Sequence, residues 1–317
     1  MRAAQATRDE QVHVQAPAGR EQPAGPKTSS TLFSVWRSRS SRRRLLLMAP
    51  ALVFLVALFV YPVSGTVLRS FVGSHGATLE WYREALTGVS LHVIGTTLLI
   101  SLETAIATAV IGLPLAHILS RLRPGLAAGA IAVIVVPQFI SAIVRTYAWI
   151  ILLDTHGVVN KVLVFLHVPG APFQLLYDNT GVLIGMTYVL LPYSVLVMYA
   201  VMRNFDRRLL GASSSLGAGR LTTFRRVYLP SILPGVVAGC MLTFILALGY
   251  YLTPALMGGE GQTVVATLID ETVRQATNSD WSYAMALGVV LLLITLGGLL
   301  VLRVLLRLTG RGGGRDR

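Results

Sequence analysis

Six long apolar stretches constrain the fold of this chain more than any other feature of the sequence. They cover approximately residues 45–67, 91–119, 126–153, 181–202, 234–256 and 283–306. A helix needs about 20 apolar residues to cross roughly 30 Å of hydrocarbon, where its backbone hydrogen bonds must be satisfied within the segment. The chain is 54% apolar and only 13% charged, an apolar excess that a soluble core does not require. We predict an all-α, polytopic integral membrane protein with six transmembrane helices.

Basic residues are distributed unequally between the connections of these helices. One set of connections holds most of the arginines: Arg37, Arg39, Arg42, Arg43, Arg44, Arg121, Arg123, Arg203, Arg207, Arg208, Arg220, Arg225, Arg226, Arg303, Arg307 and Arg311. The alternate connections, 73–90, 154–180 and 257–282, hold three basic residues against eight acidic ones. Because basic flanks tend to stay in the cytoplasm, we expect both termini on the cytoplasmic side and the acidic loops outside.

The net charge of +13 raises the alternative of a nucleic-acid partner, but the basic residues lie between apolar stretches rather than along one basic stripe. We therefore expect a lipid bilayer around the chain and no nucleic acid. A single cysteine, Cys240, excludes an intrachain disulfide and a cysteine-based metal cluster.

Both ends of the chain are polar. Residues 1–40 have too few apolar side chains to repay the entropy of ordering, so we predict that they form a disordered, basic cytoplasmic tail. We predict that residues 309–317 form a flexible, basic C-terminal tail. A secretory signal peptide is the competing interpretation for the arginines at 42–44 and the apolar run after them, but a leader of about forty polar residues is far too long. The predicted membrane domain is therefore 41–308, with its first helix retained.

The loop 203–233, between the fourth and fifth apolar stretches, is the most informative connection. It is too basic to enter the bilayer and too long for a simple turn. Small residues at 211–215 allow a short helix to pack closely against another surface, Gly217 and Gly219 permit a reversal, and Pro230 and Pro234 interrupt the next segment. We predict a helix, a turn and a second helix along the cytoplasmic face.

The spacing within this loop resembles that of ABC importer permeases. Their shared loop, the EAA motif, reads Glu-Ala-Ala, three residues, Gly, nine residues, Ile, one residue, Leu-Pro. Ala212, Gly217, Val227, Leu229 and Pro230 fall at the matching positions. Two positions depart, because Gly211 stands where the family has Glu and Ser213 stands where it has the second Ala. No role for an acidic side chain at the first position can therefore be carried over.

In that family the loop is the coupling helix that fits a groove on a separate ATPase, so the resemblance assigns docking to residues 211–217. It also implies a second related permease subunit, two copies of the ATPase, an extracytoplasmic solute-binding protein and the inner membrane of a bacterium. This chain would be a transport subunit with no catalytic residue and no cofactor, while ATP and Mg²⁺ would bind the partner ATPase. The competing interpretation of the loop is a basic amphipathic segment on anionic lipid.

Further segments resemble the spermidine/putrescine subfamily of these permeases. They are residues 136–141, 145–149, 157–160, 191–193, 251–259 and 281–286, so that the likeness extends over about residues 45–308. The resemblance implies a small cationic cargo such as a polyamine, although close relatives handle other small metabolites.

A polyamine path requires carboxylates and aromatic faces, because ammonium groups gain from ion pairing and from cation–π contacts. The candidates are Glu103, Tyr147, Trp149, Asp154, Tyr250 and Tyr251. An equally strong interpretation is that Asp154 ends the third span and that the tyrosines are interfacial anchors. Arg145 repels a cationic cargo, so we expect it to brace helices, and Pro114, Pro137 and Pro192 predict kinks that are either gates or fixed bends.

Other classes of function find less support in the sequence. No Gly-x-x-x-x-Gly-Lys-Ser/Thr loop is present, the histidines lack metal-ligand spacing, and no Ser, His and acid arrangement is suggested. An integral membrane enzyme is therefore a weak alternative. A secondary transporter or channel is a stronger one, because broken helices can hide within six apolar stretches, but it leaves the spacing within loop 203–233 unexplained.

Overall fold

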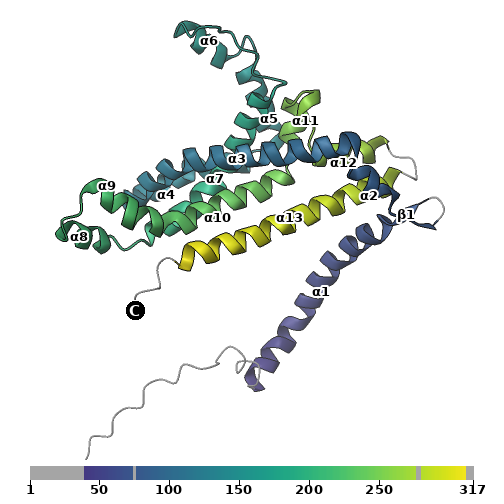
Figure 1. Cartoon of the computed structure of the whole chain (residues 1–317), viewed down its shortest axis with the longest axis horizontal. Coiled ribbons are helices and arrows are strands. Elements are labelled where there is room, and N and C mark those ends of the chain that lie inside the picture. Colours follow the sequence, from purple (N-terminus) through teal and green to yellow (C-terminus); the bar gives the residue numbers. More distant parts are fainter. Residues whose placement is uncertain (1–38, 74–75, 276–279, 312–317) are drawn as a thin grey trace, which may run out of the picture. The chain divides into compact units, whose positions relative to one another are not determined.

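Figure 1 shows the computed structural model, which describes residues 39–73, 76–275 and 280–311. The chain divides into two units, 1–60 and 61–317. The predicted tails lie almost entirely outside the described residues. The last helix continues to Arg311, which is three residues into the segment predicted as the C-terminal tail.

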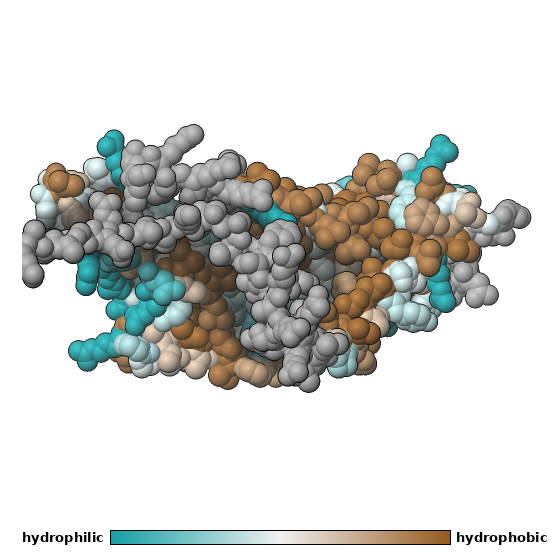
Figure 2. Space-filling view, turned by 90° about the horizontal axis from the view of Figure 1, so that it is seen from below, coloured by the Kyte–Doolittle hydropathy of each residue, from teal (hydrophilic) through white to brown (hydrophobic). Residues whose placement is uncertain are grey.

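Six segments are long and apolar enough to cross a membrane, which confirms the number predicted from the sequence. They are Met48–Arg69, Gly88–Arg121, Ala142–Phe165, Asn179–Arg203, Arg220–Leu248 and Trp281–Leu305. Figure 2 shows hydrophobic side chains, in brown, on either side of the grey residues, and hydrophilic ones, in teal, mainly toward the two ends of this face. Exposed apolar side chains on these helices, such as Val110 and Ile151, account for that surface, as expected where lipid replaces water.

The first unit is described only through residues 39–60 of α1 (Arg39–Arg69), a helix that continues into the second unit. In the second unit, α1 leads to a short hairpin of β1 (Val72–Gly73) and β2 (Gly76–Ala77), and then to α2 (Glu80–Ala85). The Tyr82 hydroxyl lies 2.6 Å from Ser70 Oγ. Tyr283 makes the same kind of contact with Ser90, also at 2.6 Å. These aromatic residues at the ends of predicted spans thus link neighbouring elements.

Three long helices form the centre of the second unit and lie side by side: α3 (Gly88–Arg121), α7 (Asn179–Arg203) and α10 (Leu229–Leu248). Small residues let them approach closely. A Cβ added at Gly235 on α10 would lie 2.6 Å from Val201 Cβ on α7. α13 (Asp280–Arg311) packs along α10 and along α12 (Val265–Gln275) (Figure 1).

The prediction of one continuous helix over residues 126–153 is wrong. The chain forms α4 (Pro124–Val135), a 3₁₀ turn η2 (Val136–Phe139), α5 (Ala142–Leu153) and α6 (Val158–Phe165). The break follows Pro137, which has no N–H to donate, and the backbone is extended at Ile140. The third membrane segment is therefore Ala142–Phe165, with a turn after Leu153, and Pro124–Phe139 is a shorter apolar helix.

The predicted fifth span, 234–256, is also interrupted. α10 ends at Leu248, and a separate helix α11 (Leu252–Met257) packs against α5 and α7 before the 3₁₀ turn η4 (Glu260–Gln262). Pro254 explains the interruption, because a proline ring clashes with the carbonyl four residues earlier in a continuous helix. At its other end the span is extended by loop residues, since it begins at Arg220.

Candidate functional site

Loop 203–233 contains the predicted helix, turn and second helix. α8 (Arg208–Ser215) is followed by α9 (Arg220–Thr223) and by the π-helical turn η3 (Phe224–Tyr228), which leads into α10. Helices of the π type are rare and occur frequently at functional sites. The spacing matched in the sequence thus spans one continuous local structure.

Gly217 closes α8 with a left-handed backbone, at φ +78°. Its N–H donates to Ser214 O at 3.0 Å, and the N–H of Ala218 donates to Ser213 O at 3.1 Å. These two bonds form a Schellman motif, in which glycine is favoured because it adopts positive φ without strain. A Cβ at Gly217 would meet no atom within 4 Å. The glycine is therefore required by the turn and not by lack of space within this chain.

The two helices of the loop are tied together by side chains. Ser213 Oγ lies 2.9 Å from Thr223 Oγ1, so the serine at a position where the ABC permeases have alanine joins α8 to α9. Gly211, Ala212, Ser215 and Leu216 are exposed, and Leu216 retains 87% of its accessible surface. One face of α8 is therefore free to contact another molecule.

Arginines attach this loop to the C-terminal end of α3. Arg203 donates to Ser120 O and to Leu122 O at 3.2 Å each, and Arg207 donates to Ser120 O at 2.8 Å. The last carbonyls of a helix lack partners within it and carry partial negative charge, so guanidinium groups stabilise that end. The start of the loop is held against α3 by these bonds.

Tyr228 attaches the other end of the loop to the same helix. Its side chain is buried, its hydroxyl lies 2.5 Å from His117 Nδ1 on α3, and its ring contacts Phe205 and Phe224 with centroids 5.3 and 5.7 Å away. Three residues of the predicted motif are close to Tyr228 in the sequence. Val227 and Leu229 are half-buried, and Pro230 is exposed in the first turn of α10.

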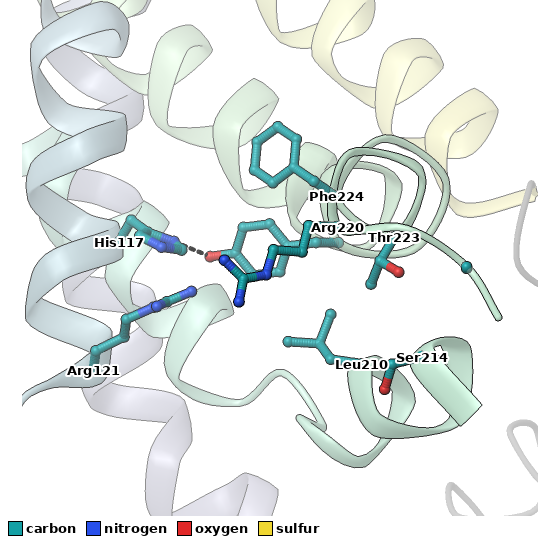
Figure 3. Close-up of a pocket in the computed structure, with 9 residues that line it drawn as sticks. His117, Arg121, Leu210, Ser214, Arg220, Thr223 and Phe224 are labelled. Atoms are coloured by element: carbon teal, nitrogen blue, oxygen red, sulfur yellow. Dashed lines mark hydrogen bonds between the residues drawn. The ribbon is translucent and has the colours of Figure 1, made fainter. Parts of the chain in front are cut away.

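A hollow of about 330 Å³ lies between α3, α8 and the α9–η3 segment. Its lining residues are His117, Arg121, Leu210, Ser214, Ala218, Arg220, Thr223, Phe224 and Tyr228 (Figure 3). Sequence reasoning missed the contribution of α3, because His117 and Arg121 lie about a hundred residues before the loop they contact. The sequence did contain one indication of this contact, because His117 is a polar residue near the end of the apolar stretch 91–119.

The predicted path residues lie on α3, on and directly after α5, and between α10 and α11. Glu103 is half-buried on α3, and its carboxylate accepts a hydrogen bond from Asn179 Nδ2 at 2.8 Å. Trp149 contacts the Tyr188 ring at 5.1 Å and lines an apolar hollow of about 350 Å³ that also includes Ala107. Ala107 lies one helical turn from Glu103, so the carboxylate and the aromatic hollow are neighbours along α3.

The other path candidates lie elsewhere. Tyr250 packs on the buried cluster that Tyr188 also contacts, whereas Tyr147 and Tyr251 are exposed. Asp154 directly follows α5 and accepts the N–H of His156 at 2.9 Å, the geometry of a residue that ends a helix.

Arg145 is buried and joins the broken third span to α7. Its guanidinium donates to Pro137 O at 3.3 Å and to Gln138 Oε1, and Gln138 Nε2 donates to Val189 O on α7 at 2.9 Å. The arginine therefore satisfies backbone and side-chain acceptors at the break, which is a bracing role.

Residues 109–311 match the family model of binding-protein-dependent transport system inner membrane components. The chain belongs to this family. The match includes the whole of loop 203–233 and the hollow beside it. The chain is accordingly a permease of an ABC importer, a transport subunit of the inner membrane.

Individual relatives cover much of the chain. It is 31% identical over 217 residues to the spermidine/putrescine transport system permease protein PotB of Escherichia coli K12, covering 68% of this chain and 78% of PotB. The inner membrane ABC transporter permease protein YdcU of the same strain is 32% identical over 196 residues, or 58% of this chain and 63% of YdcU. The molybdenum transport system permease protein ModB of Mycobacterium bovis is 29% identical over 214 residues, or 66% and 78%.

Solved structures of ABC importers share the permease fold. A chain of a bacterial alginate importer superposes with a TM-score of 0.63 at 18% identity, covering 85% of this chain and 98% of the other. A chain of the MetNI methionine transporter gives 0.53 at 19% identity, covering 69% and 95%. The fold class predicted from the sequence is confirmed.

Proposed function

We propose that this permease imports a polyamine or a similar small cation, and that α8 is the helix by which a separate ATPase moves it. A second related permease completes the path, two ATPase copies dock on the cytoplasmic side, and an extracytoplasmic binding protein delivers the cargo. Both termini and loop 203–233 then lie in the cytoplasm.

The observation that carries the docking proposal is the bracing of an exposed helix. The outer face of α8 is free, while the two ends of the loop that contains it are held on α3 by Arg203, Arg207 and Tyr228. Packed interiors deform little, so a displacement imposed on α8 is passed to α3 and α10 rather than absorbed in the loop. ATP-driven closure of the ATPases would push the two coupling helices together and turn the cavity outward, and hydrolysis would reset it.

The proposed cargo is supported by relatives and by local chemistry. Relatives named as spermidine/putrescine permeases align over two thirds of the chain. Glu103 offers a half-buried carboxylate, and the hollow one turn away is lined by the aromatic residues Trp149 and Tyr188. Ammonium groups bind carboxylates and aromatic faces, and an apolar hollow suits the methylene chain between them.

Docking is tested by co-purification of the full complex. Replacing Leu216, the exposed residue that directly follows α8, by Asp should release the ATPase while the permease still inserts in the membrane. Leu86→Asp, also at an exposed residue but in the α2–α3 connection, is the matched control and should keep the ATPase bound. Equal retention of the ATPase by both variants would refute docking through α8.

The cargo is tested by uptake of radiolabelled spermidine and putrescine into cells that express all subunits. Glu103→Gln should lower uptake about tenfold or more, since it removes a charge-assisted contact, whereas Glu80→Gln at an exposed position should not. Uptake of an anion in place of both polyamines would refute the proposed cargo and leave the docking proposal intact.

The orientation is tested by thiol labelling. Cys240 is the one cysteine of the sequence, so a Cys240→Ala background carrying Ser215→Cys reports on α8 alone. A membrane-impermeant maleimide should label Ser215→Cys only after the cells are opened. Labelling of intact spheroplasts would place the loop outside and overturn the proposal.

A further inference from the structure

Two arginine side chains converge on the hollow beside α8 without a counter-ion. Figure 3 shows the guanidinium groups of Arg121 and Arg220 directed into the same space, next to the His117–Tyr228 hydrogen bond. Neither guanidinium forms a hydrogen bond or ion pair with any residue that the structure describes. The one carboxylate of loop 203–233, Asp206, instead accepts the backbone N–H of Arg208 at 2.9 Å. Two like charges in one hollow repel each other, and an anion bound between them would offset that repulsion.

The remaining lining residues supply neutral polar groups and apolar walls. Ser214 and Thr223 also line the hollow, and their hydroxyl groups are bonded within the loop, to Gly211 O at 2.8 Å and to Ser213 Oγ at 2.9 Å. Leu210 and Phe224 provide the apolar part of the lining. Planar guanidinium groups match the oxygens of phosphate with two parallel hydrogen bonds, so the two arginines supply the donors of the hollow. The chemistry therefore suits an oxyanion such as phosphate better than a halide, and a carboxylate equally well.

The position of the hollow favours a lipid as the source of that phosphate. Arg121 is the last residue of the membrane segment Gly88–Arg121, so the hollow lies where a lipid headgroup meets the end of a spanning helix. Phe224 in its wall is 44% exposed, and the neighbouring Leu221 is 66% exposed, which leaves apolar surface for a glycerol backbone and the start of an acyl chain.

We propose that this hollow binds the phosphate of an anionic phospholipid headgroup. Arg121 and Arg220 hold the phosphate between α3 and the α9–η3 segment. A bound lipid then adds a third attachment between α3 and the coupling loop, beside those made by Tyr228 and by Arg203 with Arg207. The proposal goes beyond docking and cargo, and holds whatever solute is transported.

The experiment measures thermal unfolding of the full-length permease in nanodiscs that contain phosphatidylcholine alone or with phosphatidylglycerol. The wild type should unfold at a higher temperature with phosphatidylglycerol, because a ligand that binds only the folded state stabilises it. Arg121→Gln and Arg220→Gln should each weaken lipid binding about fivefold, as expected for loss of one basic charge near an anionic surface. The double variant should lose most of the shift, and the charge-preserving Arg121→Lys/Arg220→Lys variant should retain part of it.

Matched controls separate this site from the general basic surface. Arg123→Gln/Arg225→Gln removes two exposed arginines that do not line the hollow, and it should keep the shift. An equal loss of the shift in this control would refute a specific site. A shift of the same size produced by inorganic phosphate in phosphatidylcholine nanodiscs would overturn the lipid source. An unchanged lipid shift in Arg121→Gln/Arg220→Gln together with loss of the ATPase would assign the hollow to a carboxylate of the partner and overturn the proposal.

Discussion

Gly217 gives the sharpest test of the proposal that α8 is a coupling helix. The residue has a φ of +78°, and a Cβ at this position would meet nothing within 4 Å. The cost of Gly217→Ala is therefore one of backbone conformation, about 1–2 kcal/mol for a left-handed residue with a side chain. That cost lowers the ratio of molecules with the Gly217 turn closed to molecules with it open by about 5- to 30-fold.

The assay is the affinity of the purified permease for its ATPase, measured by titration in detergent, together with cargo-stimulated ATP hydrolysis. Gly217→Ala should weaken docking, whereas Gly217→Asn should weaken it less, because asparagine tolerates the left-handed region. Gly219→Ala is the matched control, since Gly219 has φ −65° and its added Cβ would also meet nothing within 4 Å. It should dock as the wild type does.

Two further outcomes decide what the glycine is for. A bulky residue at position 217 should abolish uptake if the helix seats in a tight groove on the ATPase, while the permease still inserts. If Gly217→Ala and Gly217→Asn both dock normally and only Gly217→Trp fails, the groove and not the turn sets the requirement. Normal transport by Gly217→Trp would refute both explanations.

Three other substitutions test the packing around the loop. Ser213→Ala removes the bond to Thr223 and should reduce the stability of the loop by about 1 kcal/mol, visible as faster proteolysis between α8 and α9. Tyr228→Phe removes the bond to His117 while keeping the ring contacts, and should lower the free energy of unfolding by about 1 kcal/mol in thermal unfolding. Gly235→Val places atoms against Val201, at 2.6 Å already for Cβ, and should cost about 1–3 kcal/mol or more; unchanged unfolding would show that α7 and α10 separate easily.

The membrane class and the loop were predictable because both are encoded locally. Twenty apolar residues in a row signal a spanning helix whatever surrounds them. The spacing from Gly211 to Pro230 is contained in one loop, and the αL turn at Gly217 is a property of consecutive residues. The same is true of the helix, turn and helix found there.

Hydropathy could not locate the interruptions in the third and fifth spans. It averages over side chains, and the break after Pro137 and the separation of α11 from α10 are changes in backbone direction within apolar sequence. Proline marked both places, but the prolines of other spans lie within continuous helices, since Pro114 is inside α3 and Pro192 is inside α7. A proline alone therefore did not distinguish a bend from a break.

The contacts that hold the loop were out of reach for another reason. Tyr228 and His117 are 111 residues apart in the sequence, and Arg207 reaches a carbonyl 87 residues away. A single sequence contains no signal that pairs residues so far apart along the chain. The neighbours of the path candidates were out of reach for the same reason, because residue type suggested their chemistry but not their contacts.

The length of α3 has a mechanical consequence. Its 34 residues extend about 51 Å at roughly 1.5 Å per residue, well beyond the hydrocarbon thickness. Ser90 near one end bonds Tyr283, and the carbonyls at the other end hold the arginines of the loop. Such a rod passes motion along its length: a tilt of about 5° pivoting at one tip carries the opposite tip roughly 4 Å, so a displacement of the loop end would shift every level of the helix in proportion to its distance from the pivot.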